Sequence, residues 1–224
     1  MTASVTIDIW SDVMCPWCVI GYKNLEQALE TLDGEIDAEI RWLPFELNPD
    51  MPPEGEESRA HIARKYGRTP EQAAAGAEMM AERARAAGFA FDYTGEGEPP
   101  ASRLWNTFDA HKLLRWTLET YGPEPQTRLK LALFAAHFQQ RRNLADRAVL
   151  LEVARTQAFD EAGAAASFDN EAIAADVRRE ERRAFDHSVN GVPAMVIDGQ
   201  FLVPGAQEPE TYVNVLRKVI ARRA

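Results

Sequence analysis

Apolar and polar residues alternate over residues 5–10, as they do in a strand that buries one face. Directly afterwards, between Cys18 and Leu32, apolar residues recur at steps of three and four, which predicts a helix that ends near Gly34. The alternation returns over residues 38–45, where Pro44 indicates the end of the strand or an edge strand. The order strand, helix, strand predicts a βαβ unit with parallel strands and a right-handed crossover.

A proline-rich, acidic connection at residues 46–57 leads into a stretch that is predicted to be almost wholly helical. Capping residues mark several helix starts: Thr69 before Pro70, and Asp146, Asp160 and Asp169. Residues 89–102 are rich in Gly and Pro and predict a loop. The helices are expected over about residues 58–66, 69–87, 104–121, 126–142, 146–157, a short segment after 160, and 169–188.

Strand patterns return at residues 194–197 and 201–203, and Asp198-Gly199 between them is typical of a tight hairpin turn. A last helix presents apolar residues on one face, from Tyr212 to Ile220. Neither β part can bury its sheet alone, so we predict one α/β fold with a four-stranded mixed sheet, in the order β-α-β … β-β-α. Residues 1–50 and 189–224 would form this domain, and residues 51–188 a large all-helical insertion domain whose final helix, 169–188, leads back to the sheet.

The composition is that of a soluble globular protein, with 46% apolar and 27% charged residues among 224. The formal net charge of −10 argues against nucleic acid as a partner, because phosphate binding requires a basic face. The N-terminus shows no charged and apolar segments of a secretory signal, and no apolar run is long enough to cross a membrane. We therefore expect a cytoplasmic protein without a membrane partner; the sequence leaves its oligomeric state open.

Both cysteines, Cys15 and Cys18, lie where the first strand ends and the first helix begins. Unpaired N–H groups and the helix dipole favour negative charge at such a position, and the thiolate is the reactive form of cysteine. A disulfide would close too small a loop to stabilise the fold much, and two thiols with four scattered histidines do not make a metal site. A redox-active pair remains, in which one thiolate attacks and the other resolves the mixed disulfide.

Five motifs, the first of which contains this pair, span nearly the whole chain. They are SDVMCPWCVIG from Ser11, FELNP from Phe45, NTFDAHKL from Asn106, GVPAMVIDG from Gly191 and GAQ from Gly205. In this order the chain resembles the thioredoxin superfamily and, more narrowly, the DsbA-like thiol–disulfide oxidoreductases of the FrnE type. Unlike some FrnE-type proteins, it has no second cysteine pair near the C-terminus, so a relay to a second disulfide is excluded.

The resemblance implies a thioredoxin-like fold in which Cys15 is the nucleophile and Cys18 the buried resolving thiol. It implies a cis Val192–Pro193 bond opposite the pair, whereas sequence alone would favour an ordinary trans proline. Pro193 has no N–H, and the backbone of Val192 could pair with an extended substrate segment. Pro16 fits the first helical turn and Trp17 lies between the cysteines, where it could form an apolar patch for substrate or simply pack.

Two polar residues of the NTFDAH motif and one before the cysteines are further candidates. His111 shares a predicted helix face with apolar residues, which favours a core histidine, but the family places this segment, with Asn106, at the redox site. We therefore retain Asn106 and His111 as candidate substrate-binding residues. Asp12 could take a proton or oppose thiolate formation, while a helix-capping or solvated role is the simpler interpretation.

The first functional hypothesis is an enzyme that exchanges the Cys15–Cys18 dithiol or disulfide with protein or small-molecule thiols, through a mixed disulfide at Cys15. No cofactor is expected, apart from glutathione as a possible thiol co-substrate. The alternatives are a glutathione-dependent isomerase or transferase, similar to 2-hydroxychromene-2-carboxylate isomerases and kappa-class glutathione transferases, and a redox-inactive, chaperone-like binding module. Serine usually replaces the first cysteine in the isomerases and transferases, so the intact pair favours redox chemistry.

Overall fold

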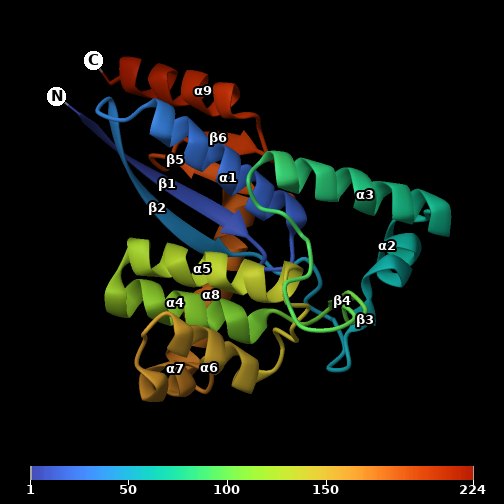
Figure 1. Cartoon of the computed structure of the whole chain (residues 1–224). Coiled ribbons are helices and arrows are strands. Elements are labelled where there is room, and N and C mark those ends of the chain that lie inside the picture. Colours follow the sequence, from blue (N-terminus) through green and yellow to red (C-terminus); the bar gives the residue numbers. More distant parts are fainter. Residues whose placement is uncertain (1, 224) are drawn as a thin grey trace.

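The computed structural model describes residues 2–223 and contains the predicted mixed sheet in the strand order β2-β1-β5-β6 (Figure 1). β1 (Ala3–Ser11) is parallel to the edge strand β2 (Ile36–Pro44). β5 (Ala194–Ile197) runs antiparallel to β1, and β6 (Phe201–Pro204) antiparallel to β5. The two distant β segments of the sequence thus complete one sheet, with β1 and β5 in its centre.

Alternation along β1 directs its side chains to two different layers of helices. Ile7 and Ile9 face the layer formed by α1 (Pro16–Thr31) and α9 (Pro209–Ala221), in the core cluster that also holds both cysteines. Trp10 faces the opposite layer, where α8 (Glu171–Asp186) packs and the Trp10 indole N–H donates to the Glu180 carbonyl at 3.1 Å. This alternation places the end of β1 between two buried layers.

The segment between β2 and α8 contains two groups of helices (Figure 1). α4 (Phe108–Tyr121), α5 (Pro123–Phe138), α6 (Arg147–Thr156) and α7 (Glu161–Ser167) share a core of their own beside the sheet. α2 (Ser58–Tyr66) and α3 (Pro70–Ala86) extend to the side toward which β1 and β2 point. The helical insertion is therefore present, while its boundaries at residues 50 and 188 stay a prediction.

Three helix starts differ from those predicted. α4 begins at Phe108 rather than at 104, because Arg103–Leu104 forms a short strand, β4, with β3 (Glu56–Glu57). α5 begins at Pro123, whose missing N–H suits a first helical position, and ends at Phe138 rather than at 142. α8 begins after Asn170, which caps it, rather than at Asp169, which pairs with Arg147. The helix propensities of neighbouring residues are too similar to predict the first residue of each of these helices.

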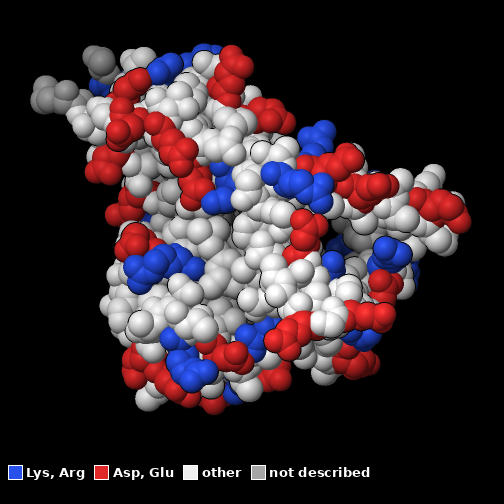
Figure 2. All heavy atoms as spheres, viewed as in Figure 1, with Lys and Arg blue, Asp and Glu red and all other residues white. Residues whose placement is uncertain are grey.

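On the face shown in Figure 2, acidic side chains gather at the upper left and along the lower edge, with basic side chains among them, and uncharged surface lies in the middle. Many of these charges are paired, as in Arg217 with Glu35 and Arg147 with Asp109. On this face the net charge of −10 does not form one acidic patch.

Gly21 lets α1 lie directly against the two loops that border β5 and β6. A Cβ atom at this position would meet Pro193 Cγ and the backbone of Ala206, both at 3.2 Å. The Gly205 N–H donates to the Pro193 carbonyl at 2.8 Å, and the Asn24 amide donates to the Gln207 carbonyl at 2.8 Å. The GVP and GAQ motifs therefore form one unit with the first helix.

We predict that Gly21→Ala and Gly76→Ala change the free energy of unfolding in opposite directions. Both glycines are helical, so each alanine gains about 1 kcal/mol of helix propensity. At Gly76 the added methyl meets only the flexible Arg68 guanidinium, whereas at Gly21 it meets backbone and a proline ring and should lose about 1–3 kcal/mol by overpacking. Urea unfolding measures the difference, and equal stabilisation by both substitutions would contradict this packing.

A second prediction concerns His137 on α5, where burial and then Arg141 lower the pKa of the imidazole to about 3. Below pH 6.5 the unfolded chain binds a proton at this residue, and the folded chain does not until about pH 3. Stability therefore falls as the pH falls through this window. In His137→Leu the decline should be shallower by up to about 1.4 kcal/mol per pH unit.

Urea unfolding of both proteins at several pH values between 3 and 7 measures this slope. Groups such as Glu46, whose pKa burial raises to about 7, are present in both proteins and cancel in the comparison. Parallel curves, separated at most by a constant offset, would mean that the substitution changed only packing and would refute the prediction.

Candidate active site

The cysteine pair occupies the first turn of α1. Cys15 is the N-cap residue, in an extended conformation, and Pro16 takes the first helical position, where its missing N–H leaves no bond unmade. The Cys15 N–H donates to the Asp12 carbonyl at 3.2 Å, and the Cys18 N–H donates to the Cys15 carbonyl at 3.1 Å. Both residues are free thiols, so the structure represents the reduced pair.

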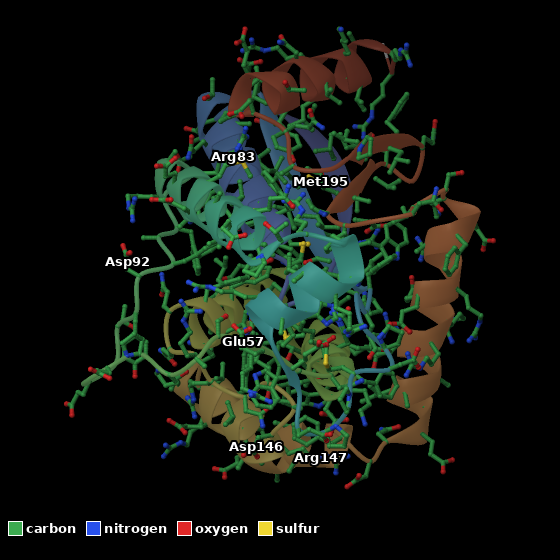
Figure 3. The ribbon with its side chains drawn as sticks, turned by 90° about the vertical axis from the view of Figure 1, so that its right-hand side faces the viewer. Glu57, Arg83, Asp92, Asp146, Arg147 and Met195 are labelled. Carbon is green, nitrogen blue, oxygen red and sulfur yellow. The ribbon has the colours of Figure 1, made fainter. Side chains whose placement is uncertain are left out.

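The Cys15 thiol faces the loop before β5. Its Sγ lies 3.6 Å from the Val192 carbonyl, and the Val192–Pro193 peptide bond is cis, as the resemblance implies. Cys15 is 3% exposed and Cys18 is fully buried, in the cluster that includes Met195, which Figure 3 labels. The partly exposed Pro16, Trp17 and Val192 lie next to the two sulfur-bearing residues and the cis proline. Cys15 is thus the sulfur nearer the surface, with Cys18 beneath it.

Burial, rather than the helix start, dominates the acidity of Cys15. Desolvation raises the pKa of this thiol well above its usual value, and the neighbouring Cys18 thiol and Asp12 raise it further. The Cys18 backbone N–H works in the opposite direction. The expectation of an easily ionised thiol, which rested on its position at a helix N-terminus, therefore omitted the larger effect.

Asp12 is a buried carboxylate and not a solvated surface group. Its Oδ1 accepts from the Met14 N–H at 3.2 Å, and its Oδ2 accepts from the Leu47 N–H at 2.8 Å. Burial raises the pKa of Asp12, while these N–H groups and Lys130 lower it. The carboxylate joins the turn before Cys15 to the loop that follows β2, and its charge stands close to the thiol pair.

The two candidates of the NTFDAH motif both lie on the α4 side of this turn. His111 is buried, bonds to the Phe45 backbone, and has its Nε2 4.0 Å from Asp12 Oδ1; burial lowers the pKa of its imidazole well below the usual value. Asn106 donates to the Pro49 carbonyl at 3.0 Å and accepts the Phe108 N–H at 3.0 Å. Its bonds run to the loop after β2 and to α4 rather than to the cysteines.

Trp17 lies between the pair and the projecting helices. Its ring packs beside Ile20 and Ala84, and the Arg83 guanidinium lies 5.5 Å above it. Figure 3 shows Arg83 on α3. The tryptophan is partly exposed, so it both packs and contributes apolar surface next to the site.

Lys130 and Glu46 belong to the same neighbourhood and were not predicted. Lys130, on α5, is 0% exposed, and its Nζ donates to the Ser11 carbonyl at 3.3 Å. Glu46 is buried and pairs with Arg178, and burial raises the pKa of its carboxyl to about 7. The available signals were a lysine in the nearly all-apolar middle of the predicted helix 126–142 and the acidic residue within FELNP.

Metal-ligand clusters and membrane-spanning helices are both absent from residues 2–223. No group of three or more His, Cys, Asp or Glu side chains could hold a metal ion there. Over the same residues, none of the helices combines the length and apolar character required to cross a bilayer.

Comparison with known proteins shows what this chain is similar to. The chain is 30% identical to a probable DsbA oxidoreductase of Streptomyces coelicolor, whose crystal structure superimposes with a TM-score of 0.85 over 98% of this chain and 92% of that one. It is 24% identical to the uncharacterized protein YwbO of Bacillus subtilis, over 95% of this chain and 96% of that protein.

More distant structures share the fold. The cytosolic disulfide reductase DsbM of Pseudomonas aeruginosa, also solved with GSH, is 18% identical, with a TM-score of 0.61 over 98% of this chain and 100% of that one. A 2-hydroxychromene-2-carboxylate isomerase is 13% identical, with a TM-score of 0.59 over 97% and 95%. Residues 6–217 match the family described as the DSBA-like thioredoxin domain. The chain therefore belongs to the DsbA-like thioredoxin domain family.

Proposed function

We propose that this protein is a thiol–disulfide oxidoreductase that exchanges the Cys15–Cys18 pair with thiols and disulfides of proteins or small molecules. The observation that carries the proposal is the position of the Cys15 thiol, at the start of α1 and 3.6 Å from the Val192 carbonyl, with a second thiol one helical turn below. Membership of the DsbA-like family supports the same chemistry.

In the reducing direction the Cys15 thiolate attacks one sulfur of a substrate disulfide and forms a mixed disulfide, while the other substrate sulfur leaves as a thiolate that takes up a proton. Cys18 then loses its proton and attacks the Cys15 sulfur. The internal Cys15–Cys18 disulfide forms, and the second substrate thiol is released. Two electrons pass from the pair to the substrate, and the same steps run backward when the pair oxidises a dithiol.

The substrate would approach along the cis-proline loop. Val192 presents its carbonyl toward Cys15, so a donor on a bound segment could replace the Cys15 thiol as its partner. Pro16, Trp17 and Pro193 would contact the groups beside the reacting sulfur. Glutathione is the proposed small thiol co-substrate, because a fold relative, DsbM, has been solved with GSH.

We place this activity in the cytoplasm. DsbM, which shares the fold, is described as cytosolic, and reducing compartments favour catalytic over structural use of two neighbouring cysteines. Asn106 and His111 would not touch the reacting sulfurs. Asn106 would hold the loop after β2, and His111 the turn that carries Asp12.

We predict that Cys15→Ser abolishes reduction of a glutathione mixed disulfide and of insulin, because no thiolate remains to attack the substrate. Cys18→Ser should instead accumulate a mixed disulfide at Cys15, because the resolving thiol is missing. Coupled reductase assays and intact-protein mass spectrometry measure both results. Serine replaces sulfur with the smaller oxygen at both sites, so the two variants are matched controls for each other.

The same panel tests the alternatives. Isomerisation of an aromatic substrate that survives in Cys15→Ser would favour the glutathione-dependent isomerase, for which the structural likeness extends to the fold alone. Protection of an unfolding client by the double serine variant, without any thiol exchange by the wild type, would favour the chaperone-like module. Either result would overturn the proposal.

A further inference from the structure

A hollow at one end of the sheet is lined by four arginines and by none of the predicted site residues. Its volume is about 560 Å³, within the range of small-molecule sites. β1 contributes Thr6 and Asp8, whose side chains alternate with those that face α1. The hairpin between β5 and β6 and the C-terminal end of α9 also line it. Figure 1 shows this end of α9 on the side of the sheet away from the start of α1.

A buried carboxylate holds two of the four arginines in place. Asp8 is 4% exposed, and its Oδ1 accepts from the Arg41 Nε at 2.8 Å. Its Oδ2 accepts from a terminal nitrogen of Arg183 at 3.5 Å, and the other terminal nitrogen of Arg183 donates to Glu180 at 2.8 Å. The side chains of Arg41 and Arg183 are 41% and 40% exposed. Each guanidinium is therefore fixed on one side and open to the hollow or to solvent on the other.

The hairpin turn holds a third arginine in a similar way, and the fourth lies on an aromatic ring. Asp198 accepts the Thr6 N–H at 3.1 Å and pairs with Arg223 at the end of α9. The guanidinium of the preceding Arg222 lies 5.5 Å from the centre of the Phe201 ring. Among residues 2–223, no carboxylate forms an ion pair with Arg222. The hollow thus combines an uncompensated cation with an aromatic side chain.

Hydrogen-bond donors outnumber acceptors on this lining. Four arginines face two aspartates, although the chain as a whole has a formal net charge of −10. The Nε of Arg41 is bonded to Asp8, with the exposed Glu39 further away at 3.9 Å. Within the described part of the chain, the two terminal nitrogens of Arg41 make no hydrogen bond. These nitrogens and the guanidinium of Arg222 are the donors that remain for a ligand.

We propose that this hollow binds a small molecule that joins an oxyanion, phosphate or carboxylate, to an apolar ring. Guanidinium groups bind both oxyanions through parallel N–H bonds, so Arg41 and Arg222 would hold the anionic group. The ring of Phe201 would contact the apolar portion of the ligand. Asp8 positions Arg41 for this contact and does not itself touch the ligand. The site is separate from the proposed function, because no step of thiol exchange uses these residues.

The test is calorimetric titration at fixed ionic strength with phenyl phosphate, with benzoate, and with benzyl alcohol as the uncharged control. Wild type should bind at least one of the two anions saturably and should not bind benzyl alcohol. The stronger of the two anions identifies which oxyanion the site prefers. Absence of saturable binding of both anions, or equal binding of the uncharged alcohol, would overturn the proposal.

Variants locate the binding. Arg222→Gln removes no ion pair among the described residues, so the fold should be retained, and it should weaken binding of the preferred anion about tenfold. Arg128→Gln is the matched control, because Arg128 is a half-exposed arginine on α5 that does not line the hollow. It should leave the affinity unchanged. Equal weakening by both substitutions would mean unspecific charge attraction and would overturn the proposal.

A second readout follows the arginine of β2 directly. With ¹⁵N-labelled arginine, the Nε–H resonance of Arg41 should shift as the preferred anion is added, in wild type and in Cys15→Ser alike. An Arg41 resonance that does not move while the anion binds would overturn the proposal. Loss of thiol exchange in Cys15→Ser with an unchanged anion affinity would separate this site from the proposed function.

Discussion

The junction between β1 and α1 imposes the central constraint on this protein. A helix start carries unpaired N–H groups, and here it is buried together with two thiols and the carboxylate of Asp12. Each polar group must find a partner there. Asp12 bonds to the N–H groups of Met14 and Leu47, and the Cys15 thiol bonds to the Val192 carbonyl. Partners from two distant segments, the loop after β2 and the loop before β5, thus meet at this turn.

This requirement explains why the motifs are spread along the chain. The FELNP segment supplies the Leu47 N–H for Asp12, and the GVP segment supplies the carbonyl that faces Cys15. Gly21 and the GAQ segment allow α1 to approach Pro193 closely. Asn106, at the start of α4, holds the loop after β2 in place. These motif residues therefore support the position of the thiol pair.

The helical insertion has an electrostatic as well as a spatial relation to the site. α5 brings Lys130 to the Ser11 carbonyl at the end of β1, and α4 brings His111 to 4.0 Å from Asp12. α3 reaches Trp17 through Arg83 and Ala84. The sheet domain supplies the sulfurs and Asp12, and the insertion supplies Lys130, which lowers the pKa of Asp12, and His111 beside that carboxylate.

The sequence by itself determined the order of the elements, the mixed sheet and the location of the cysteine pair. Hydrophobic periodicity is a local property, so the strands at residues 5–10 and 194–197 and the capped helix at residues 69–87 could be predicted from their neighbours. The cis bond at Pro193 followed from the family resemblance, since sequence alone would favour trans. The strand pair β3–β4 was missed, because two residues of alternation carry no detectable pattern.

Only the tertiary structure decided the charge environment of the sulfurs. The pKa of a buried group depends on the atoms that exclude water from it and on charges brought close by folding, and neither has a local sequence pattern. Burial therefore reversed the expectation that the Cys15 thiol ionises easily, and it makes Asp12 a buried rather than a surface residue. Folding also brings Lys130 to the Ser11 carbonyl from more than a hundred residues away in the sequence.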